Sequence, residues 1–406
     1  MKKGITLKQS LFLLPLLILL AVFAVYPILT SAVYSLFDYR TNDQTVAGLY
    51  TGEKFNALLF NEDCGYVTWY LGDDVTLLEG EDQAEMQSII DEISEMGAQY
   101  EGATEVVQID QQAGLELRER LSEIKTELLD IYERNSDVEF WNGAEKQELL
   151  FNEMDGCFIS GNFTGLKAYG KLFTDERFWT SLKTTLIFTV ISVFFEFVLG
   201  MFLALIMNKA IKGIGGVRTI ALIPWAIPTA VSALMWSYMY DGSSGIIAKI
   251  FADLGFIDSP ELMLLSAGGA MTAAILADVW KTTPYMALLL LAGLQTIDSG
   301  LYESAAIDGS GPVRTFFSIT LPLLKPSILV ALLFRTLDAF RVYDLIAVLT
   351  GGSQGTETLS IYAYKLMIGQ SNYGYGSAVV LAMAICVGII AFIFVKVLGA
   401  ELISDD

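Results

Sequence analysis

The sequence predicts an all-α membrane protein of six transmembrane helices, with a soluble α+β domain inserted after the first helix. Two observations predict this class. Hydrophobic residues make up 53% of the 406 positions and charged residues only 17%, which is more apolar than a soluble domain needs. The net charge of −21 arises in one segment, because 31 Asp and Glu face 10 Lys and Arg between Asp38 and Arg177, while the rest of the chain holds 15 acidic and 15 basic residues. That segment is therefore a separate acidic domain.

Six apolar runs are long enough to cross about 30 Å of hydrocarbon as helices. They cover approximately residues 11–36, 179–207, 219–240, 262–291, 327–349 and 378–398. The first run follows three lysines, as a secretory signal would. Its apolar core is too long for a usual signal peptide and has no small-x-small exit, so we predict a retained first helix.

Basic residues set the expected orientation. They lie before the first run, between the second and third runs, and between the fourth and fifth: Lys2, Lys3, Lys8, Lys209, Lys212, Arg218, Arg314 and Lys325. All three regions fall on one side if six helices alternate. We therefore expect a multi-pass protein of the cell membrane with both termini cytoplasmic and the acidic domain exoplasmic.

The acidic domain covers residues 41–161. Apolar residues recur at helical spacing in its centre, at Met86, Ile89, Ile90, Ile93 and Met96 and again at Leu115, Leu121, Ile124, Leu128 and Ile131. Its ends, TWYLGDDVTLL and GCFISGNF, look like strands. The pattern predicts a helical hairpin on a small strand base.

Two near-copies, LFNEDCG at Leu59 and LFNEMDGC at Leu150, bracket this centre. Chance similarity in so short a window is an equal alternative. If the copies are counterparts, Cys64 and Cys157 occupy matching points of adjoining strands, and a disulfide between them is expected outside the membrane. A reducing habitat would leave both thiols free.

The motifs of common enzymes are missing. The chain has no histidine, no G-x-x-x-x-G-K-[ST] phosphate loop, no G-x-S-x-G elbow and no cysteine pair at zinc spacing. The acidic stretch DDVTLLEGED lacks the pattern of a calcium loop, so a solvated surface is favoured there. We expect no catalytic residue, no bound metal or cofactor and no nucleic-acid partner.

A polar segment, LYESAAIDGSGPVRTFFSITLPLLKPSI, lies between the fourth and fifth runs at residues 301–328. Asp298 or Ser299 can cap a short helix that Gly309 and Gly311 end. Ser310 and Pro312 suit the N-cap and first turn of a second helix, and Pro322 and Pro326 are expected to end it before the fifth run. The segment predicts a helix-turn-helix finger on the cytoplasmic face.

The order of residues in this finger resembles the E-A-A-x3-G-x9-I-x-L-P signature of ABC-importer permeases. The matching positions are Glu303, Ser304, Ala305, Gly309, Ile319, Leu321 and Pro322, with Ser304 in place of the usual first alanine. Four further stretches, NFTGLKAYGKLFTDERFWTSLKTTLIFT, IPWAIPTAVSALMW, DVWKTTPYMALLLLAGLQTI and FRTLDAFRVYDLIAVLTGGSQGTETLSIYAY, look like carbohydrate-importer permeases of the maltose and trehalose type. The acidic insert departs from that pattern.

This resemblance implies a type I ABC importer fold for the chain on either side of the acidic insert, which gives three regions. Residues 1–40 form the N-terminus and first helix, residues 41–161 the insert, and residues 162–406 the permease core, which includes an ATPase-coupling loop at 295–326. The expected partners are a second permease, two cytoplasmic ATPases that hold ATP and Mg²⁺, an extracellular sugar-binding lipoprotein and a carbohydrate. The residues expected to contact an ATPase are those of the signature and Asp308.

Polar side chains inside the apolar runs are costly and are often functional. The candidates for a substrate path are Asp278, Trp280, Lys281, Tyr285, Asp338, Arg341, Tyr343 and Asp344. A sugar needs hydrogen-bond partners and an aromatic face, and this set offers both. An ion-pair ladder that fixes packing is the favoured alternative for Arg335 and Asp338. Glu196 is expected to pair with a neighbouring helix or with the second permease, and Pro224 and Pro228 are expected to kink the third helix.

Three functions are compatible with the residues alone. The first is a carbohydrate permease, with a weak preference for alpha-linked glucosides. The second is a permease of the same architecture for a polyol or a glycerophosphodiester. The third is a membrane-anchored receptor whose acidic domain binds a partner, which the Glu303 signature opposes because a receptor needs no ATPase-coupling finger.

Overall fold

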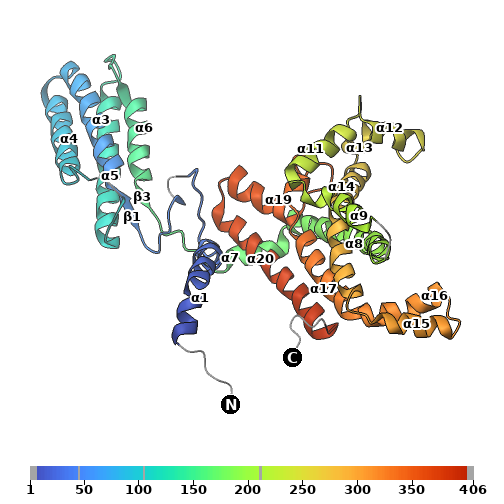
Figure 1. Cartoon of the computed structure of the whole chain (residues 1–406). Helices are drawn as coiled ribbons and strands as arrows, with labels where there is room; N and C mark the ends of the chain where they lie inside the picture. The colour runs from blue at the N-terminus through green and yellow to red at the C-terminus, as the bar shows by residue number, and fades with distance from the viewer. Residues whose placement is uncertain (1–6, 44–45, 104–105, 210–212, 400–406) are drawn as a thin grey trace. The chain divides into compact units, whose positions relative to one another are not determined.

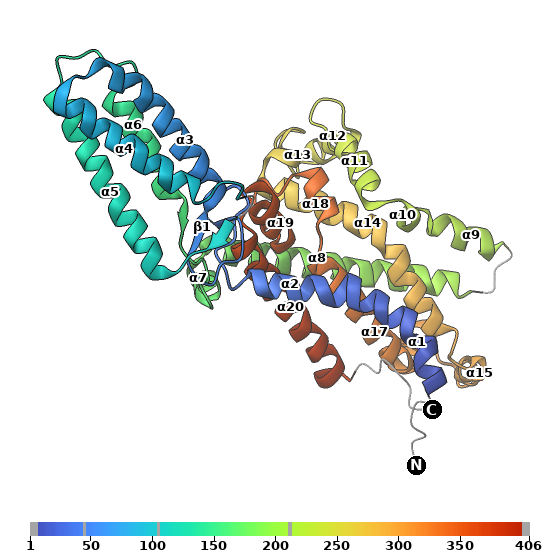
Figure 2. The same ribbon diagram turned by 90° about the vertical axis from the view of Figure 1, so that its left-hand side faces the viewer.

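The computed structural model describes residues 7–43, 46–103, 106–209 and 213–399. Lys2, Lys3 and Lys212, which contributed to the expected orientation, lie outside the described residues. The chain divides into two compact units (Figures 1 and 2). The membrane unit comprises Met1–Ala32, Tyr169–Gly369 and Gly376–Asp406, and the acidic unit comprises Val33–Ala168 and Gln370–Tyr375.

Apolar helices dominate the membrane unit. In chain order its main elements are α1 (Leu7–Leu20), η1 (Ala21–Val25), α2 (Tyr26–Tyr34), α8 (Glu176–Met207), α9 (Ile214–Ala221), α10 (Ile223–Ala226), α11 (Thr229–Met239), α12 (Ile246–Asp253), α13 (Leu262–Leu265), α14 (Ala267–Leu294), α15 (Ser299–Ile307), α16 (Pro312–Thr315), η4 (Phe316–Thr320), α17 (Leu321–Phe340), α18 (Asp344–Leu349), α19 (Leu359–Tyr364), η5 (Lys365–Gly369), α20 (Tyr373–Phe392) and η6 (Ile393–Val397). Within the described residues, five helices are long and apolar enough to cross a membrane, or six if one bent pair counts as a single span.

The third span is bent, as its prolines predict, whereas the fifth is broken where the sequence predicts an uninterrupted helix. The third bends by 88° between residues 214–226 and 229–239, where Pro228 interrupts the helix. The fifth is broken at Arg341–Tyr343, between α17 and α18. The prediction that Pro322 and Pro326 end the finger is wrong, because residues 312–340 form one apolar span. Pro322 directly follows the π-helical turn η4, in which the Leu321 N–H bonds the Phe316 carbonyl, and Pro326 lies one turn further on; the helix continues through both prolines.

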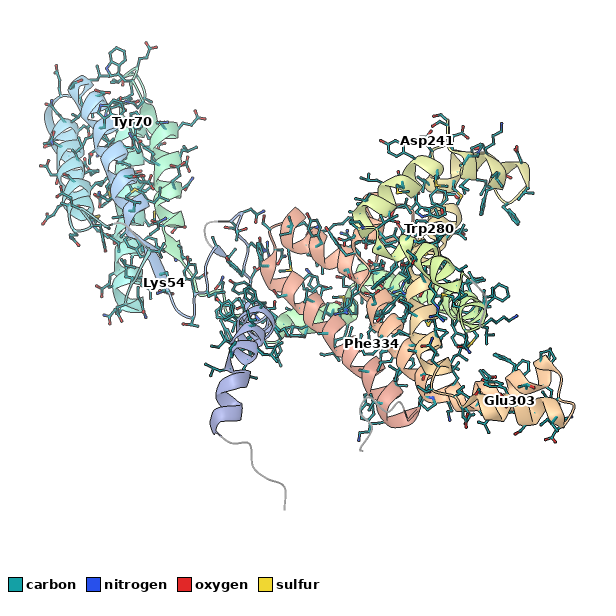
Figure 3. The ribbon with its side chains drawn as sticks, viewed as in Figure 1. Lys54, Tyr70, Asp241, Trp280, Glu303 and Phe334 are labelled. Atoms are coloured by element: carbon teal, nitrogen blue, oxygen red, sulfur yellow. The ribbon has the colours of Figure 1, made fainter. Side chains whose placement is uncertain are left out.

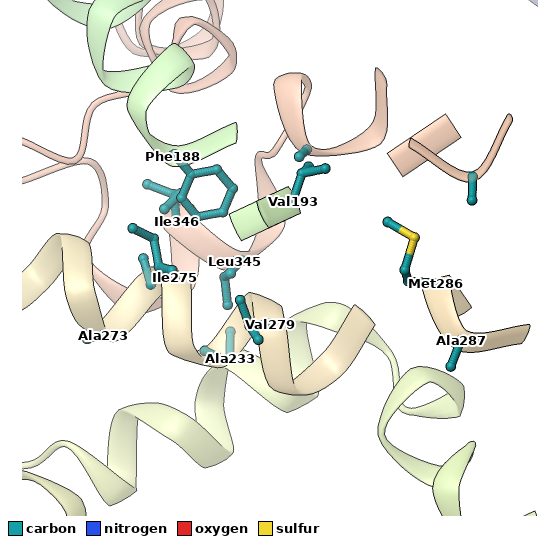
Figure 4. Close-up of a cluster of buried hydrophobic side chains, with 14 of the residues drawn as sticks. Phe188, Val193, Ala233, Ala273, Ile275, Val279, Met286, Ala287, Leu345 and Ile346 are labelled. Carbon is teal, nitrogen blue, oxygen red and sulfur yellow. The ribbon is translucent and has the colours of Figure 1, made fainter. Parts of the chain in front are cut away.

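The centre of the membrane unit is the contact between α8 and α14. Gly200 of α8 faces Met286 of α14 so closely that an added Cβ would lie 2.7 Å from the methionine Cγ. Phe188 and Val193 continue this buried cluster, in which Leu345 of α18 also takes part (Figure 4). This close packing makes α8 and α14 a rigid pair, against which the helices of the bent third span and the broken fifth span pack.

In its described residues, the acidic unit consists of four α-helices that extend from a three-stranded antiparallel sheet (Figure 2). The elements are β1 (Lys54–Asn56), α3 (Ala57–Asp74), η3 (Val75–Leu77), α4 (Gly80–Ala98), β2 (Val106–Gln108), α5 (Gln111–Arg134), α6 (Gly143–Gly156) and β3 (Phe158–Ile159), with strand order β2-β1-β3. The predicted hairpin corresponds to α4 and α5, but α3 and α6 are further helices. The stretch TWYLGDDVTLL is the end of α3 and a 3-10 turn, so its prediction as a strand is wrong.

A buried carboxylate joins three helices of the acidic unit. Asp74 at the end of α3 accepts a hydrogen bond from the Tyr132 hydroxyl of α5 at 2.8 Å. It also accepts from the backbone N–H groups of Asn142 and Gly143, each at 3.0 Å, at the start of α6. The Asp74 carboxylate thereby satisfies N–H groups that have no acceptor within α6 at its N-terminus.

The two cysteines of the acidic unit lie in helical surroundings, not on the adjoining strands that the sequence predicts. Cys64 is inside α3 and Cys157 is the C-cap of α6, because the two LFNE copies belong to these helices. Both thiols are buried and free, so the structure does not contain the predicted disulfide. The Cys157 thiol donates to the Asp63 carboxylate at 3.8 Å, and burial raises the pKa of Cys64 to about 12.

Two short segments close the acidic unit on one side. The backbone N–H of Gly374 donates to the Tyr39 carbonyl at 3.0 Å, and that of Thr41 donates to the Ser371 carbonyl at 3.1 Å. Arg40 and Asn372 form an isolated antiparallel bridge between them. Residues 370–375, which come late in the chain, therefore belong to the same unit as residues 33–168.

Candidate substrate cavity and coupling surface

A cavity of about 340 Å³ lies inside the membrane unit, where the two broken spans meet α14. Its lining residues are Trp225, Thr229, Asp278, Lys281, Thr282, Arg335, Asp338, Ala339, Arg341, Val342, Tyr343, Asp344 and Leu345. Six of the eight residues predicted for a substrate path are among them. Trp280 and Tyr285 are not. The sequence reasoning missed Trp225 and Thr229, although the prolines at 224 and 228 marked their neighbourhood.

The aromatic residues outside the lining pack against other rings. Tyr285 stacks on Trp225 with ring centroids 5.5 Å apart and planes inclined by 12°. Trp280, which Figure 3 labels, meets Trp236 of α11 edge to face at 5.6 Å. Tyr285 therefore supports an aromatic wall of the cavity from behind, while Trp280 packs on α11.

Lys281 holds the break of the third span. The Ile227–Pro228 step is extended, with φ −73° and ψ 133° at Ile227, as expected for a residue before proline. The break leaves backbone carbonyls without helical donors. The Lys281 ammonium of α14 donates to two of them, to Ile227 O at 2.8 Å and to Trp225 O at 3.3 Å. One side chain thus replaces backbone hydrogen bonds that the bend removes.

The break of the fifth span is held from a different direction. The Thr358 hydroxyl donates to the Val342 carbonyl at 3.2 Å, and the Arg341 guanidinium donates back to the Leu337 carbonyl at 3.0 Å. Asp344 begins α18 just beyond the break. Arg341, Tyr343 and Asp344 all line the cavity. In a continuous helix Arg341 and Asp344 would share a face and Tyr343 would point away from it, so the break is what brings all three to the cavity.

Arg335 is the centre of a buried ion-pair network. Its guanidinium donates to both oxygens of Glu196 on α8, one of them at 2.9 Å, and to Asp278 on α14. A further N–H donates to Asp338 at 2.8 Å, one turn along α17. The expected pairing of Arg335 with Asp338 is present, and Glu196 pairs with a neighbouring helix, here α17. Three spans are joined at one point.

The cavity wall is balanced in charge. Three carboxylates, Asp278, Asp338 and Asp344, face three cations, Lys281, Arg335 and Arg341. Glu196 lies behind this wall and is fully buried. The lining residues alone therefore carry no formal net charge, and Glu196 adds one carboxylate to the Arg335 network behind them.

The polar segment after α14 forms a finger of two short helices. The Asp298 carboxylate accepts from the Gly300 N–H at 2.9 Å and caps α15. Gly309 ends that helix with φ +74°, a conformation that glycine adopts without strain. The N-cap of α16 is Gly311, not Ser310 as predicted, because the Ser310 hydroxyl accepts from Thr315 instead. The two helices joined by a turn are as predicted, but the second continues through η4 into α17 and does not end at the prolines.

Most of the signature residues, with Asp308, lie at the surface of this finger. Glu303, Ser304, Asp308, Gly309 and Pro322 are exposed, Ile319 and Leu321 are half-buried, and Ala305 is buried. Figure 3 shows Glu303 on the finger. Apolar side chains stand beside them in the open, with Ile307 86% and Phe317 62% exposed. A surface of this kind is typical of a contact with another protein.

A groove of about 890 Å³ separates the finger from the end of α8. Phe202, Leu205 and Ile206 of α8 line one side, and Tyr302, Phe316 and Phe317 line the other. The Tyr302 hydroxyl of α15 is 3.2 Å from the Thr320 hydroxyl of η4, so one hydrogen bond links the two helices of the finger.

Broken apolar helices around a charge-balanced cavity, with an exposed finger at the end of α14, define the membrane permease of a transporter. Residues 170–403 match the family described as "Binding-protein-dependent transport system inner membrane component", and the chain belongs to this family. It is a permease subunit of the ABC importer class. Family membership favours this reading over a membrane-anchored receptor.

Two relatives and one solved structure illustrate the match. The trehalose/maltose transport system permease protein MalF of Thermococcus litoralis is 46% identical over 237 residues, which is 58% of this chain and 79% of that protein. The trehalose transport system permease protein SugA of Mycobacterium tuberculosis is 44% identical over 238 residues, 59% of this chain and 76% of that one. A bacterial alginate ABC transporter in complex with alginate pentasaccharide-bound periplasmic protein has a chain with 25% identity and a TM-score of 0.52, covering 57% of this chain and 81% of its own.

Proposed function

We propose that this chain forms the translocation path of an ATP-driven importer for a neutral carbohydrate, with an alpha-linked glucoside of two or more units as the substrate. The observation that carries the proposal is the cavity beside the two broken helices. Its paired charges offer hydrogen-bond donors and acceptors without net charge, and the stacked Trp225 and Tyr285 rings supply an aromatic wall. The names of the MalF and SugA relatives support the same substrate class.

The same proposal includes the partners. The chain pairs with a second permease, receives substrate from an exported sugar-binding lipoprotein, and couples to two cytoplasmic ATPases that bind ATP and Mg²⁺. The finger around Glu303 is the coupling element, because its exposed carboxylate and apolar side chains offer a docking surface that the chain itself does not cover. Both termini and the finger are cytoplasmic, and the acidic unit is exoplasmic.

Uptake of radiolabelled trehalose and maltose in cells that express the complete importer tests the substrate class. Trp225→Ala removes the aromatic wall, and we expect the apparent KM to rise while the amount of assembled complex stays constant. Leu115→Ala, an exposed position of the acidic unit, is the matched control. Failure of the wild-type importer to take up any neutral sugar would refute the proposal.

Pull-down of the tagged chain from its membrane tests the coupling. We expect the wild type to retain an ATPase, a second permease and a sugar-binding lipoprotein. Glu303→Lys reverses the charge of the finger and should lose only the ATPase. Retention of the ATPase by this variant would contradict the role given to Glu303.

A second candidate is a small anionic solute such as a glycerophosphodiester. It is supported by Lys281 and Arg341, two cations in the cavity wall. Uptake of a labelled glycerophosphodiester, such as glycerophosphoglycerol, by the same cells distinguishes it. The balancing carboxylates of Asp338 and Asp344 favour the neutral sugar.

A further inference from the structure

One face of α3 in the acidic unit carries three aromatic side chains, of which Tyr66 and Trp69 are exposed and Tyr70 is half-buried against the core. Tyr66, Trp69 and Tyr70 are spaced i, i+3 and i+4, so they project from the same side of the helix. Trp69 is 62% exposed. The Trp69 and Tyr70 ring centroids are 5.2 Å apart and those of Tyr66 and Tyr70 are 6.5 Å apart, with planes inclined by 23° in both pairs. We call these three residues the α3 aromatic platform, and Figure 3 labels Tyr70.

Two glycines keep this platform open. Gly65 and Gly72 lie four residues before and three residues after Trp69, inside α3. A glycine within a helix costs about 0.5–1 kcal/mol relative to alanine. Packing does not require either one, because an added Cβ would meet no atom within 4 Å. Their effect is to leave free space on both sides of the indole, at a cost to the stability of the helix.

Polar groups surround the rings. The Lys146 ammonium of α6 lies 5.1 Å from the centroid of the Tyr70 ring. Glu62 and Asp73 are exposed on the same side of α3, one turn before Tyr66 and one turn after Trp69. Aromatic faces are negative and attract the C–H faces of a ligand, while carboxylates and an ammonium group can bond hydroxyls. The combination suits a ligand with apolar ring faces and a hydroxylated rim.

The charge of the acidic unit restricts the ligand further. Its 29 Asp and Glu against 8 Lys and Arg repel anionic lipids, anionic polysaccharides and acidic proteins. A neutral ligand is not repelled. We propose that the α3 aromatic platform binds a neutral oligosaccharide. This inference rests on the proposed carbohydrate import and adds a second sugar contact in a part of the chain that the family match, residues 170–403, does not cover.

The experiment uses the full chain in lipid nanodiscs, labelled with 5-fluorotryptophan and observed by ¹⁹F NMR. Trp69→Phe assigns the Trp69 resonance by its absence. On titration with maltoheptaose we expect a saturable shift of this resonance. An anionic alginate pentasaccharide should bind at least tenfold more weakly, because the acidic unit repels it. Leu115→Ala should bind maltoheptaose like the wild type.

Two variants separate binding from folding. Tyr66→Ala removes one ring and should weaken maltoheptaose binding about tenfold, equivalent to about 1.4 kcal/mol. Gly65→Gln fills the space beside the indole without removing an aromatic ring, and it replaces glycine with a better helix former. We expect this second variant to lose binding while the thermal stability of the chain rises or stays constant.

Three outcomes would overturn the inference. The first is an unmoved Trp69 resonance with maltoheptaose above about 10 mM, a concentration at which even weak binding is visible. The second is full binding by Gly65→Gln. The third is a shift caused by the sugar-binding lipoprotein without sugar but not by maltoheptaose, which would assign the platform to a protein partner. Sugar uptake by the complete importer, measured in parallel, shows whether the proposed function stands when the platform fails.

Discussion

Replacing Arg335 by methionine tests the buried network most directly. The substitution keeps the length of the side chain but leaves the Glu196 and Asp278 carboxylates, whose side chains are 0% and 9% exposed, without their common cation. Removing one partner of a buried ion pair costs about 3–5 kcal/mol, because the remaining charge is not solvated. We expect Arg335→Met to lower the free energy of unfolding by this amount, measured by SDS titration of the detergent-solubilised chain.

Two further variants give this experiment its controls. Asp338 belongs to the same network but its side chain is 66% exposed, so Asp338→Asn should cost below about 1 kcal/mol. Combining Arg335→Met with Glu196→Gln and Asp278→Asn removes every buried charge and should restore most of the loss. A loss of less than about 1 kcal/mol in the single variant, or a triple variant as unstable as the single one, would refute the reasoning.

Three other predictions concern packing, helix propensity and pH. Gly200→Leu forces a side chain against Met286 and should destabilise the membrane unit by about 1–3 kcal/mol, read from the same SDS titration; an unchanged midpoint would contradict the close contact of α8 and α14. Gly65→Ala should stabilise α3 by about 0.5–1 kcal/mol, seen as slower hydrogen exchange of its amides, and faster exchange would be against it. Burial, and to a smaller extent the negative charge of Glu153, raises the pKa of Asp63 to about 6, which is above the pKa of an aspartate in the unfolded chain. The folded acidic unit therefore binds a proton at Asp63 more tightly than the unfolded chain does. Its stability should therefore rise as the pH falls from 7 toward 4, and Asp63→Asn should remove this part of the pH dependence; an identical pH profile in the variant would show that Asp63 does not contribute.

The membrane unit could be predicted well from its sequence because hydropathy and one short signature carry strong signals. The apolar runs gave the spans, and the spacing from Glu303 to Pro322 indicated the finger. The break at Arg341–Tyr343 could not be predicted, since no proline or glycine marks it and the structure maintains it through Thr358, sixteen residues away from Val342. The partner of Arg335 on α8 was equally hidden, because it depends on which helices pack together.

The acidic unit was harder to predict for a physical reason. The stretch TWYLGDDVTLL is short and mixes β-branched, aromatic and polar residues, so its periodicity fits a strand as well as the end of a helix. The structure resolves the ambiguity through tertiary contacts. Val67 and Leu71 enter the buried core at helical spacing, and Asp74 binds α5 and α6. Cys64 and Cys157 follow these helices into the core instead of the strand positions.

The pairing of residues 370–375 with Tyr39 and Thr41 has a consequence for the order in which the chain is made. Residues 33–168 leave the ribosome first, but the last six residues of the acidic unit follow about 200 residues later. At about 5–20 residues per second, that interval is roughly 10–40 s of synthesis. During this time the edge at Tyr39 and Thr41 has no partner, and the unit closes only after four intervening spans have been synthesised. A ribosome stalled before residue 370 should therefore expose Arg40 to protease, and one stalled well after residue 375 should protect it.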